Sequence, residues 1–567
     1  MKPFYRLNKN SRYFLSKWYL IEWQSAEERI SEISKTAENI LWIDWFADKF
    51  YEYISKWYYS LSTPVWNNFW NNRWLPISCF GSYINDTMGS ILYTSAEVWM
   101  MSKLWWGTSG FFWNLRPRWS WIKNNWKSSW AVHFMKLFES MIDVSNQWAS
   151  RRWAFTPYLP LEHDDIEEFL EIGTEWNPIQ KCTTWVTVTD WWLESMKNWD
   201  KDKRKTRAKV LQRRSEVWYP YIAFKDNINN QSPDVYKDKW LEITHQNLCA
   251  EIALSDSKDK SFVCCLSSIN LLHRDEIKNT DAVETMIYFL DAVMQEFIDK
   301  LEARRDSEDS EDNEKFEFMK RAYNFAKEER ALWLWVLGWH SHLQSKMIPF
   351  ESEYANLLNK DIFQTIQSKS FQASKELATM YWEPELLKWY WRRNSCVNAI
   401  APTTSSAFIL WQVSQSIEPW FSNYVVKDLA KWKVTLKNKF LKDLLDKYEM
   451  NTDEVRESIM NNDGSVQHLE FLTDNERDVF KTFREIDQYA IINQAADRQV
   501  YIDQWQSLNL LVDPKTPTKE INSLYLYAWE KGIKSLYYQH SVSAAQELWR
   551  KNKRVECSWE TCTVCQA

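Results

Sequence analysis

Asn247-Leu248-Cys249-Ala250-Glu251 is the stretch from which the fold and chemistry of this chain are best read. In an extended segment alternate side chains share a face, so an amide, a thiol and a carboxylate would point together. A half-buried strand with one structural cysteine is the alternative interpretation. Two further stretches place thiols among polar neighbours, Leu75-Pro76-Ile77-Ser78-Cys79 and Phe262-Val263-Cys264-Cys265-Leu266-Ser267. Three such sites together indicate redox chemistry.

The composition around these stretches is that of a globular protein of a few subdomains. The 567 residues carry a formal net charge of −7, without the basic face that a nucleic acid duplex requires. No segment reaches the roughly 20 apolar residues that cross a bilayer, and the N-terminus lacks a signal-peptide pattern. Nine scattered cysteines, an odd number, suggest a reducing compartment. We therefore expect a cytoplasmic protein that binds neither nucleic acid nor membrane.

Glycine and tryptophan occur in abnormal numbers. The chain has 8 Gly and 38 Trp, whereas ordinary usage of roughly 7% would give about 40 glycines. We hypothesise that most of these tryptophans stand where the functional protein has glycine, because UGA codons read as glycine were rendered as tryptophan. Strings such as Trp105-Trp106-Gly107 and Asn125-Trp126-Lys127 agree, since turns favour a residue that is free to adopt positive φ. A truly Trp-rich aromatic binding platform is the alternative.

Local patterns predict how the chain is organised. Ser25 and Glu28 form a possible capping box before an apolar face of Ile30, Ile33, Ala37 and Ile40, which predicts an N-terminal helix. Short β-prone runs at 183–189, 262–266 and 399–400 alternate with long amphipathic helices, which favours an α/β fold. The charged runs at 306–315 and 201–214 are interpreted as a solvated loop and as an exposed turn with a helix end. We expect a helical segment at 1–58, a catalytic domain at 59–545 and a mobile, cysteine-bearing tail at 546–567.

From about Ser62 onward the chain resembles the catalytic large subunit of a class I ribonucleotide reductase. The resemblance is carried by an ordered set of strings: Ser62-Thr63-Pro64, Ser78-Cys79, Asn247-x-Cys249-x-Glu251, Ala401-Pro402-Thr403-Thr404-Ser405-Ser406, Ser535-Leu536-Tyr537-Tyr538-Gln539 and the cysteine tail. It implies an α/β barrel of ten strands, two antiparallel sets of five parallel strands, with a central finger loop that carries Cys249. In the same comparison Trp126, Trp148, Trp153 and Trp411 fall where relatives typically have glycine, whereas Trp339 and Trp529 look genuine.

The resemblance implies a catalytic set. Cys249 would become a thiyl radical that abstracts the 3′ hydrogen of a ribonucleotide. Glu251 would take the 3′-OH proton as general base, and Asn247 would hold the same edge of the sugar. Cys79 and Cys264 would be the reducing pair that becomes a disulfide as the 2′-OH leaves as water. The neighbouring Cys265 points to the opposite face of a strand and is interpreted as structural.

Substrate and effector sites follow from the same resemblance. Thr403, Thr404, Ser405 and Ser406 offer hydroxyls and backbone N–H groups to a phosphate at a helix start, although a simple N-cap is the alternative. The remaining substrate contacts match Thr63 and Ser78. ATP or deoxynucleotide effectors would meet Asp86 through the ribose and Arg116 and Lys123 through the phosphates, with surface charge as the alternative. The loop 147–153 would connect the effector to the substrate by changing shape, with Arg151 as its substrate-facing member.

The resemblance also implies a route by which the radical reaches the active site and a means of reducing the active-site disulfide after each turnover. Tyr537 and Tyr538 would relay a radical generated in a separate, metal-containing β subunit, so no cofactor or metal is expected in this subunit. The tail carries Cys557, Cys562 and Cys565, two of which would reduce Cys79–Cys264 and be recharged by thioredoxin or glutaredoxin. A zinc site is the competing interpretation of the tail, but a fourth ligand is not nearby in the sequence.

The expected function is therefore that of a ribonucleoside-diphosphate reductase catalytic subunit, acting as a homodimer under allosteric control and making deoxyribonucleotides for DNA synthesis. The alternatives are a cobalamin-dependent reductase of the same superfamily and an inactive nucleotide-binding paralogue. Only about 60 residues precede the matched region, which leaves too little room for the N-terminal nucleotide-binding cone of some relatives. We accordingly expect specificity control without on/off inhibition by dATP.

Overall fold

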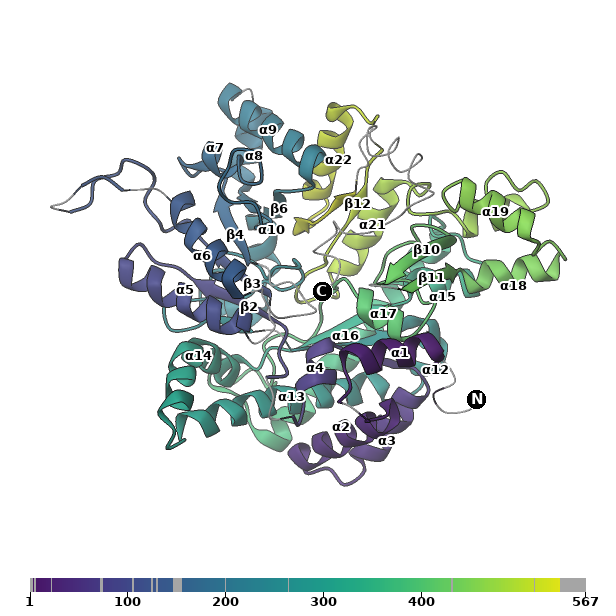
Figure 1. The fold of residues 1–567 in the computed structure, drawn as a ribbon, viewed down its shortest axis with the longest axis horizontal. Coiled ribbons are helices and arrows are strands. Elements are labelled where there is room, and N and C mark those ends of the chain that lie inside the picture. The colour runs from purple at the N-terminus through teal and green to yellow at the C-terminus, as the bar shows by residue number, and fades with distance from the viewer. Residues whose placement is uncertain are drawn as a thin grey trace.

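Most of the chain is placed in a computed structural model (Figure 1). It describes residues 4, 7–21, 23–71, 75–103, 107–123, 126–128, 131–145, 155–198, 200–263, 265–429, 432–513 and 515–540, with only the backbone described at 145, 425–429, 432–436 and 540.

Five parallel strands form the first half of the fold. They are β2 (Cys79–Tyr83), β3 (Gly107–Phe111), β4 (Phe155–Pro160), β5 (Trp185–Val188) and β6 (Tyr221–Phe224), and they lie side by side in chain order. Parallel neighbours need crossover connections, which here include α5 (Met88–Lys103), α6 (Ala131–Ser145), α7 (Ile166–Phe169), α8 (Asp190–Lys197) and α9 (Lys201–Val217). The expected strand at 183–189 is thus confirmed as β5.

A second parallel set follows further along the chain. Strands β8 (Leu266–Asn270) and β9 (Trp333–Leu337) are parallel neighbours, and parallel bridges join Leu334 to Asn398 and Ile400 to Gln506. The set ends with β12 (Leu510–Leu511) parallel to β14 (Gln539–His540). The β-prone residues at 399–400 therefore supply the middle of this second set.

Two antiparallel contacts join the sets into a barrel. Strand β13 (Ser535–Leu536), which leads into β14, pairs antiparallel with β6, and β7 (Phe262–Val263), which leads towards β8, pairs antiparallel with β2. The two sets are therefore linked at both of their edges. Across the described residues, the predicted barrel of two antiparallel sets of five parallel strands is confirmed.

Helices cover the outside of the barrel (Figure 1). The longest are α13 (Ala282–Arg305), α14 (Ser310–Glu329) and α16 (Glu353–Tyr381), whose buried faces are rich in aliphatic and aromatic residues. The others are α10 (Lys225–Asn230), α11 (Asp234–Asp238), η2 (Leu271–His273), α12 (Arg274–Ile277), α15 (Trp339–Ser345), η3 (Glu385–Leu387), α17 (Thr404–Ile409), α21 (Gln488–Gln499) and α22 (Thr518–Glu530).

The N-terminal residues are helical, as expected, and pack onto the barrel core. Helices α1 (Lys9–Trp18), α2 (Ala26–Leu41) and α3 (Phe46–Ser55) precede β1 (Tyr59–Leu61), which pairs with β8, and α4 (Thr63–Asn68). The capping box of Ser25 and Glu28 is present. Ile30, Ile33 and Ala37 are buried, whereas Ile40 is only half-buried.

Two local predictions were wrong. Residues 310–315, expected in a loop, begin α14, because Asp309 caps the helix and Glu311 and Asp312 in its first turn favour the positive end of the helix dipole. Residues 201–214 form most of α9 rather than an exposed turn, and Arg207, Arg213 and Arg214 are buried. Burial is possible because the guanidinium groups donate to partners elsewhere, including Asn522 and Tyr525.

A small satellite beside the barrel was not anticipated from the sequence. The hairpin β10 (Tyr424–Leu429) and β11 (Trp432–Lys437) and helices α18 (Lys439–Lys447), α19 (Asp453–Asn461) and α20 (Asp474–Val479) surround a second, separate hydrophobic cluster. Figure 1 shows α18 and α19 projecting from the body.

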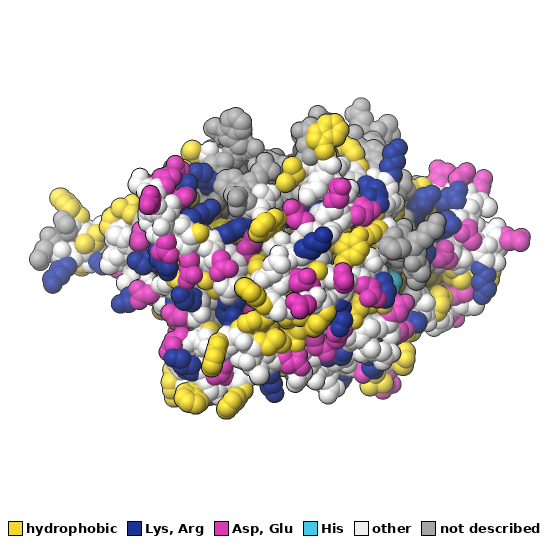
Figure 2. Space-filling model, turned by 90° about the horizontal axis from the view of Figure 1, so that it is seen from below, with side chains coloured by type: hydrophobic (Ala, Val, Ile, Leu, Met, Phe, Trp, Pro, Cys, Tyr) yellow, Lys and Arg dark blue, Asp and Glu magenta, His cyan; other side chains and the backbone are white. Residues whose placement is uncertain are grey.

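The surface carries mixed charges. On the face seen in Figure 2, lysine and arginine are interspersed with aspartate and glutamate, and hydrophobic side chains stand out among them. Within the described part of the chain, no helix combines the length and the apolar character needed to cross a membrane.

Candidate active site

A tight loop presents Cys249, in a form that differs from the expected extended segment. Gln246 and Ala253 form an antiparallel bridge, and the Asn247 N–H donates to the Ile252 carbonyl (2.9 Å). Ala250 has a φ of +71°, in the left-handed region. The chain therefore reverses direction here, and Asn247 and Glu251 meet across the turn rather than by strand alternation.

Both halves of the barrel hold this loop. From the first set, the Tyr158 hydroxyl on β4 donates to the Asn247 carbonyl (3.1 Å). From the second set, the Trp505 N–H donates to the Glu251 carbonyl (3.1 Å) and the Ser507 hydroxyl donates to the Cys249 carbonyl. Since these bonds come from opposite sets, the loop lies at the centre of the barrel, as the finger loop was predicted to do.

Glu251 is a buried carboxyl with polar partners. Its Oε1 accepts a hydrogen bond from Asn247 Nδ2 (2.8 Å), and its Oε2 lies 3.4 Å from the Ser507 hydroxyl. Burial, and after it the neighbouring Cys79, raise the pKa of Glu251 well above its ordinary value, although the bonds from Asn247 and Ser507 oppose the shift. A carboxylate in this state is a stronger base than an exposed glutamate.

The structure brings one predicted reducing thiol to this carboxyl. Cys79 begins β2, is 6% exposed and is close enough to Glu251 to affect its pKa. The Cys265 sulfur donates to the Leu290 carbonyl of α13 (3.4 Å), so this thiol faces outward from the barrel as expected of a structural cysteine. Cys264 lies outside the described residues.

The predicted radical relay is an aromatic cluster. The rings of Tyr537 and Tyr538 lie 4.4 Å apart between centroids, and both side chains are buried. The Tyr221 ring on β6 approaches both, at 4.6 Å from Tyr537 and 5.1 Å from Tyr538. Arg214 Nη2 donates to the Tyr537 carbonyl (2.9 Å) and its Nε donates to the Tyr525 hydroxyl (2.9 Å), which anchors this segment to α9 and α22.

The predicted substrate residues occupy two places. Thr403 precedes α17 and accepts a hydrogen bond from the Ser416 N–H (2.7 Å), and Thr404, Ser405 and Ser406 form the first turn of that helix. The expected helix start is confirmed, but Thr403 makes no side-chain cap bond within α17. Ser78 is buried next to Cys79, and Thr63 begins α4.

The N-terminal helices reach these substrate residues. Tyr19, directly after α1, shares a hydrogen bond of 3.1 Å with Thr63 through the two hydroxyls. The Phe14 ring packs against Phe408 of α17 at 4.9 Å. Side chains from the N-terminal segment thus support both predicted contact regions.

The predicted effector residues are partly brought together. Arg116 Nε donates to Asp86 (2.6 Å), and both side chains are about one-third exposed, at 34% and 31%. Lys123 is exposed. Arg151 and the tail cysteines Cys557, Cys562 and Cys565 lie outside the described residues.

Several residues of the site carry no sequence signal. Tyr158, Tyr221 and Ser507 lie in ordinary strand-like or polar stretches, and Arg214 belongs to a run interpreted as exposed charge. Each reaches the site only because strands and helices distant in sequence meet there. Hydroxyls and a guanidinium that donate to main-chain carbonyls cannot be recognised from spacing alone.

Comparisons with known proteins agree with this geometry. The family described as "Ribonucleotide reductase, barrel domain" matches residues 77–206, 200–384 and 381–539. The "Putative ribonucleoside-diphosphate reductase large subunit" of Frog virus 3 (isolate Goorha) is 32% identical, over 92% of each chain. The "Ribonucleoside-diphosphate reductase large subunit" of Invertebrate iridescent virus 3 is 30% identical, over 87% of this chain and 88% of that protein.

A solved structure extends the likeness to three dimensions. It is described as "Actinobacillus ureae class Id ribonucleotide reductase alpha subunit", is 50% identical and superposes with a TM-score of 0.89, covering 96% of this chain and 99% of that one. The chain therefore belongs to the ribonucleotide reductase family, as a large, catalytic subunit of class I.

Proposed function

We propose that this subunit reduces ribonucleoside diphosphates to 2′-deoxyribonucleoside diphosphates with a thiyl radical on Cys249. One observation carries the proposal: the finger loop holds Cys249, Asn247 and the buried Glu251 together at the centre of the barrel, beside Cys79. The relatives named as ribonucleoside-diphosphate reductases support diphosphates as the substrate class.

The residues divide the chemistry among them. The Cys249 radical takes the 3′ hydrogen atom, and Glu251 accepts the 3′-OH proton while Asn247 steadies the carboxylate. Cys79 and Cys264 then supply the two electrons and the protons with which the 2′-OH leaves as water, and they form a disulfide. Cys249 returns the hydrogen atom to C3′, so its radical is restored and the net change is one ribose reduced and one dithiol oxidised.

The radical, the electrons and the control come from elsewhere. A separate metal-containing β subunit would supply the radical, which is consistent with the packed rings of Tyr537 and Tyr538 and with the likeness to a class I α subunit. Two of the tail cysteines would reduce the disulfide and be recharged by thioredoxin or glutaredoxin. Nucleotide effectors would bind at Asp86 and Arg116, in a homodimer.

The test is turnover of CDP and ADP with a class Id β subunit and a dithiol. Two forms of the chain serve as starting enzymes, one with tryptophan as printed and one with glycine at the positions assigned in the following subsection. Cys249→Ser should abolish turnover, because serine cannot form the radical. The matched control Cys182→Ser, at a buried cysteine outside the site, should retain it.

The outcomes separate the candidate functions. Dithiol-dependent turnover that Cys249→Ser abolishes supports the proposal. Appreciable turnover by Cys249→Ser, or none by either form with a competent β subunit, would overturn it. Turnover by the isolated chain that depends on added adenosylcobalamin would instead favour a cobalamin-dependent enzyme.

A further inference from the structure

Tryptophan occupies backbone positions that suit glycine. Of the nineteen non-glycine residues with positive φ in the described chain, eleven are tryptophan: Trp23, Trp42, Trp57, Trp70, Trp119, Trp218, Trp240, Trp382, Trp389, Trp391 and Trp411. A Cβ atom crowds the following carbonyl in this region, so a bulky residue with positive φ is a genuine outlier. Four of the eight glycines have positive φ as well. Glycine and tryptophan thus share the same unusual backbone conformation.

Buried indoles provide a second, independent signal. Seven buried indole N–H groups find no hydrogen-bond partner among the described residues, those of Trp57, Trp66, Trp185, Trp333, Trp335, Trp420 and Trp505. Native proteins seldom leave a buried donor unpaired. Trp339 and Trp529 differ, because their indole N–H groups donate to Gln494 (3.1 Å) and Asp190 (2.6 Å). These are the two tryptophans that look genuine from the family resemblance.

Two of the orphaned indoles point into the barrel from β9. Cys265 faces outward towards α13, so by strand alternation Leu266 and Ser268 of β8 face inward. The register pairs Leu266 with Trp333 and Ser268 with Trp335. Neighbouring strands present paired residues on the same face, so both indoles occupy the barrel interior, where they are 0% and 8% exposed.

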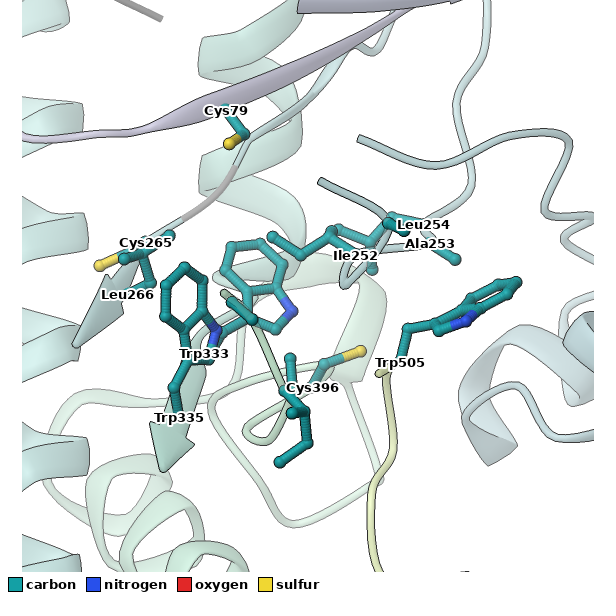
Figure 3. Close-up of a cluster of buried hydrophobic side chains, with 14 of the residues drawn as sticks. Cys79, Ile252, Ala253, Leu254, Cys265, Leu266, Trp333, Trp335, Cys396 and Trp505 are labelled. Carbon is teal, nitrogen blue, oxygen red and sulfur yellow. The ribbon is translucent and has the colours of Figure 1, made fainter. Parts of the chain in front are cut away.

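A third orphaned indole lies next to the finger loop. The backbone N–H of Trp505 donates to the Glu251 carbonyl, whereas its indole N–H is unpaired, and the side chain is 1% exposed. Figure 3 shows Trp333 and Trp335 side by side between Cys79 and Cys396, with Trp505 in the same cluster on the other side of Cys396 and Ile252, Ala253 and Leu254 close by. Three large side chains therefore fill the barrel interior beside the residues that follow Glu251.

We propose that positions 333, 335 and 505 carry glycine in the working protein, and that the volume filled by these three indoles is the pocket for the substrate's ribose. Without side chains there, the interior opens directly beneath Cys79 and the finger loop, and three unpaired donors disappear. The occupant of the pocket rests on the proposed function, whereas the identity of the three residues does not.

Peptide mass spectrometry of the protein purified from its source organism tests the residue identities. Trypsin cleaves after Arg330 and Lys346, so one peptide contains positions 333, 335 and 339 together. We expect glycine at 333 and 335 and tryptophan at 339 in the same peptide, and glycine at 505 in peptide 499–515. Tryptophan at 333, 335 or 505 would overturn the inference, whatever the enzyme does.

Nucleotide binding tests the pocket without reference to turnover. Equilibrium dialysis with labelled CDP compares the printed chain with the triple variant Trp333→Gly, Trp335→Gly, Trp505→Gly. The control triple Trp57→Gly, Trp66→Gly, Trp420→Gly removes three other indoles whose buried N–H groups are also orphaned.

We expect the site triple to bind CDP at least tenfold more tightly than the printed chain, and the control triple to bind as the printed chain does. Equal gains in the two triples, or a folded site triple that does not bind CDP, would refute the pocket. Glycine in the native peptides together with CDP binding but no turnover would leave the pocket intact and count against the proposed function alone.

Discussion

Replacing the exposed positive-φ tryptophans by glycine should stabilise the protein. Eight of the eleven are exposed, Trp23, Trp42, Trp70, Trp119, Trp240, Trp382, Trp389 and Trp391, so removing their indoles leaves no core cavity. Several sit at helix ends; Trp42, for example, follows α2 with φ 52° and ψ 42°. Glycine is the usual residue at such left-handed helix ends because it has no Cβ.

The size of the effect follows from two opposing terms. Relief of the left-handed strain is worth about 1–2 kcal/mol per residue. The greater freedom of glycine in the unfolded chain offsets about 0.4–1 kcal/mol of this. A net gain of about 0.5–1 kcal/mol per position gives about 4–8 kcal/mol for all eight. With an unfolding entropy of about 2.1 cal/mol/K per residue, the melting temperature should rise by roughly 3–7 °C.

Scanning calorimetry of the eightfold variant measures this shift, whereas a single replacement would move the midpoint by less than about 1 °C. The matched control places alanine at the same eight positions, which removes the indoles but keeps the strained Cβ atoms. We expect its melting temperature to stay near that of the printed chain. The strain argument would be refuted if the melting temperature of the alanine variant rose as much as that of the glycine variant, or if the glycine variant melted at a lower temperature than the printed chain.

Three further predictions concern the active site. Burial raises the pKa of Glu251 and only its deprotonated form is a base, so kcat should begin to fall with decreasing pH at a higher pH than it would with an ordinary glutamate. Asn247→Leu removes a hydrogen bond that lowers this pKa, so the acidic fall in kcat should move to a still higher pH. A fall that moves to lower pH in this variant would contradict the assignment of Glu251 as the base. Arg214→Gln should loosen the Tyr537 segment and so lower kcat without changing KM. The control Arg204→Gln removes an exposed hydrogen bond to the Lys197 carbonyl and should leave kcat unchanged. An unchanged kcat in Arg214→Gln would show that the Arg214 anchor is dispensable. Tyr19→Phe removes a hydrogen bond to Thr63 worth about 1 kcal/mol, so KM for CDP should rise about fivefold with kcat unchanged. An unaltered KM would show that Thr63 does not contact the substrate.

Local features of the fold could be predicted from the sequence. The capping box before α2 and the strand at β5 depend on residues within a few positions of each other, so their spacing is sufficient. The boundary of α14 was misjudged because acidic residues suit both a solvated loop and the first turn of a helix. The burial of Arg207 and Arg214 in α9 was missed for a different reason, since their partners Asn522 and Tyr525 lie more than 300 residues away in the chain.

The reactive residue types and their place on a central finger loop could also be predicted, but the way in which the loop brings them together could not. Asn247, Cys249 and Glu251 were expected to meet by strand alternation, and they meet instead across a turn that hydrogen bonds from β4 and from residues 505–507 hold in place. Those bonds exist only once both parallel sets have closed into the barrel. Tyr221 and Arg214 join the tyrosine pair for the same reason.

The glycine and tryptophan positions show most clearly what the sequence determines and what only the tertiary structure determines. The counts of 8 and 38 alone led to the hypothesis that many tryptophans stand in place of glycine, because composition needs no structure. The φ angles and the unpaired indoles add particular positions to those that the resemblance named, and these features depend on how distant segments pack. Residue chemistry is encoded locally, whereas backbone strain and the pairing of buried donors are properties of the closed tertiary structure.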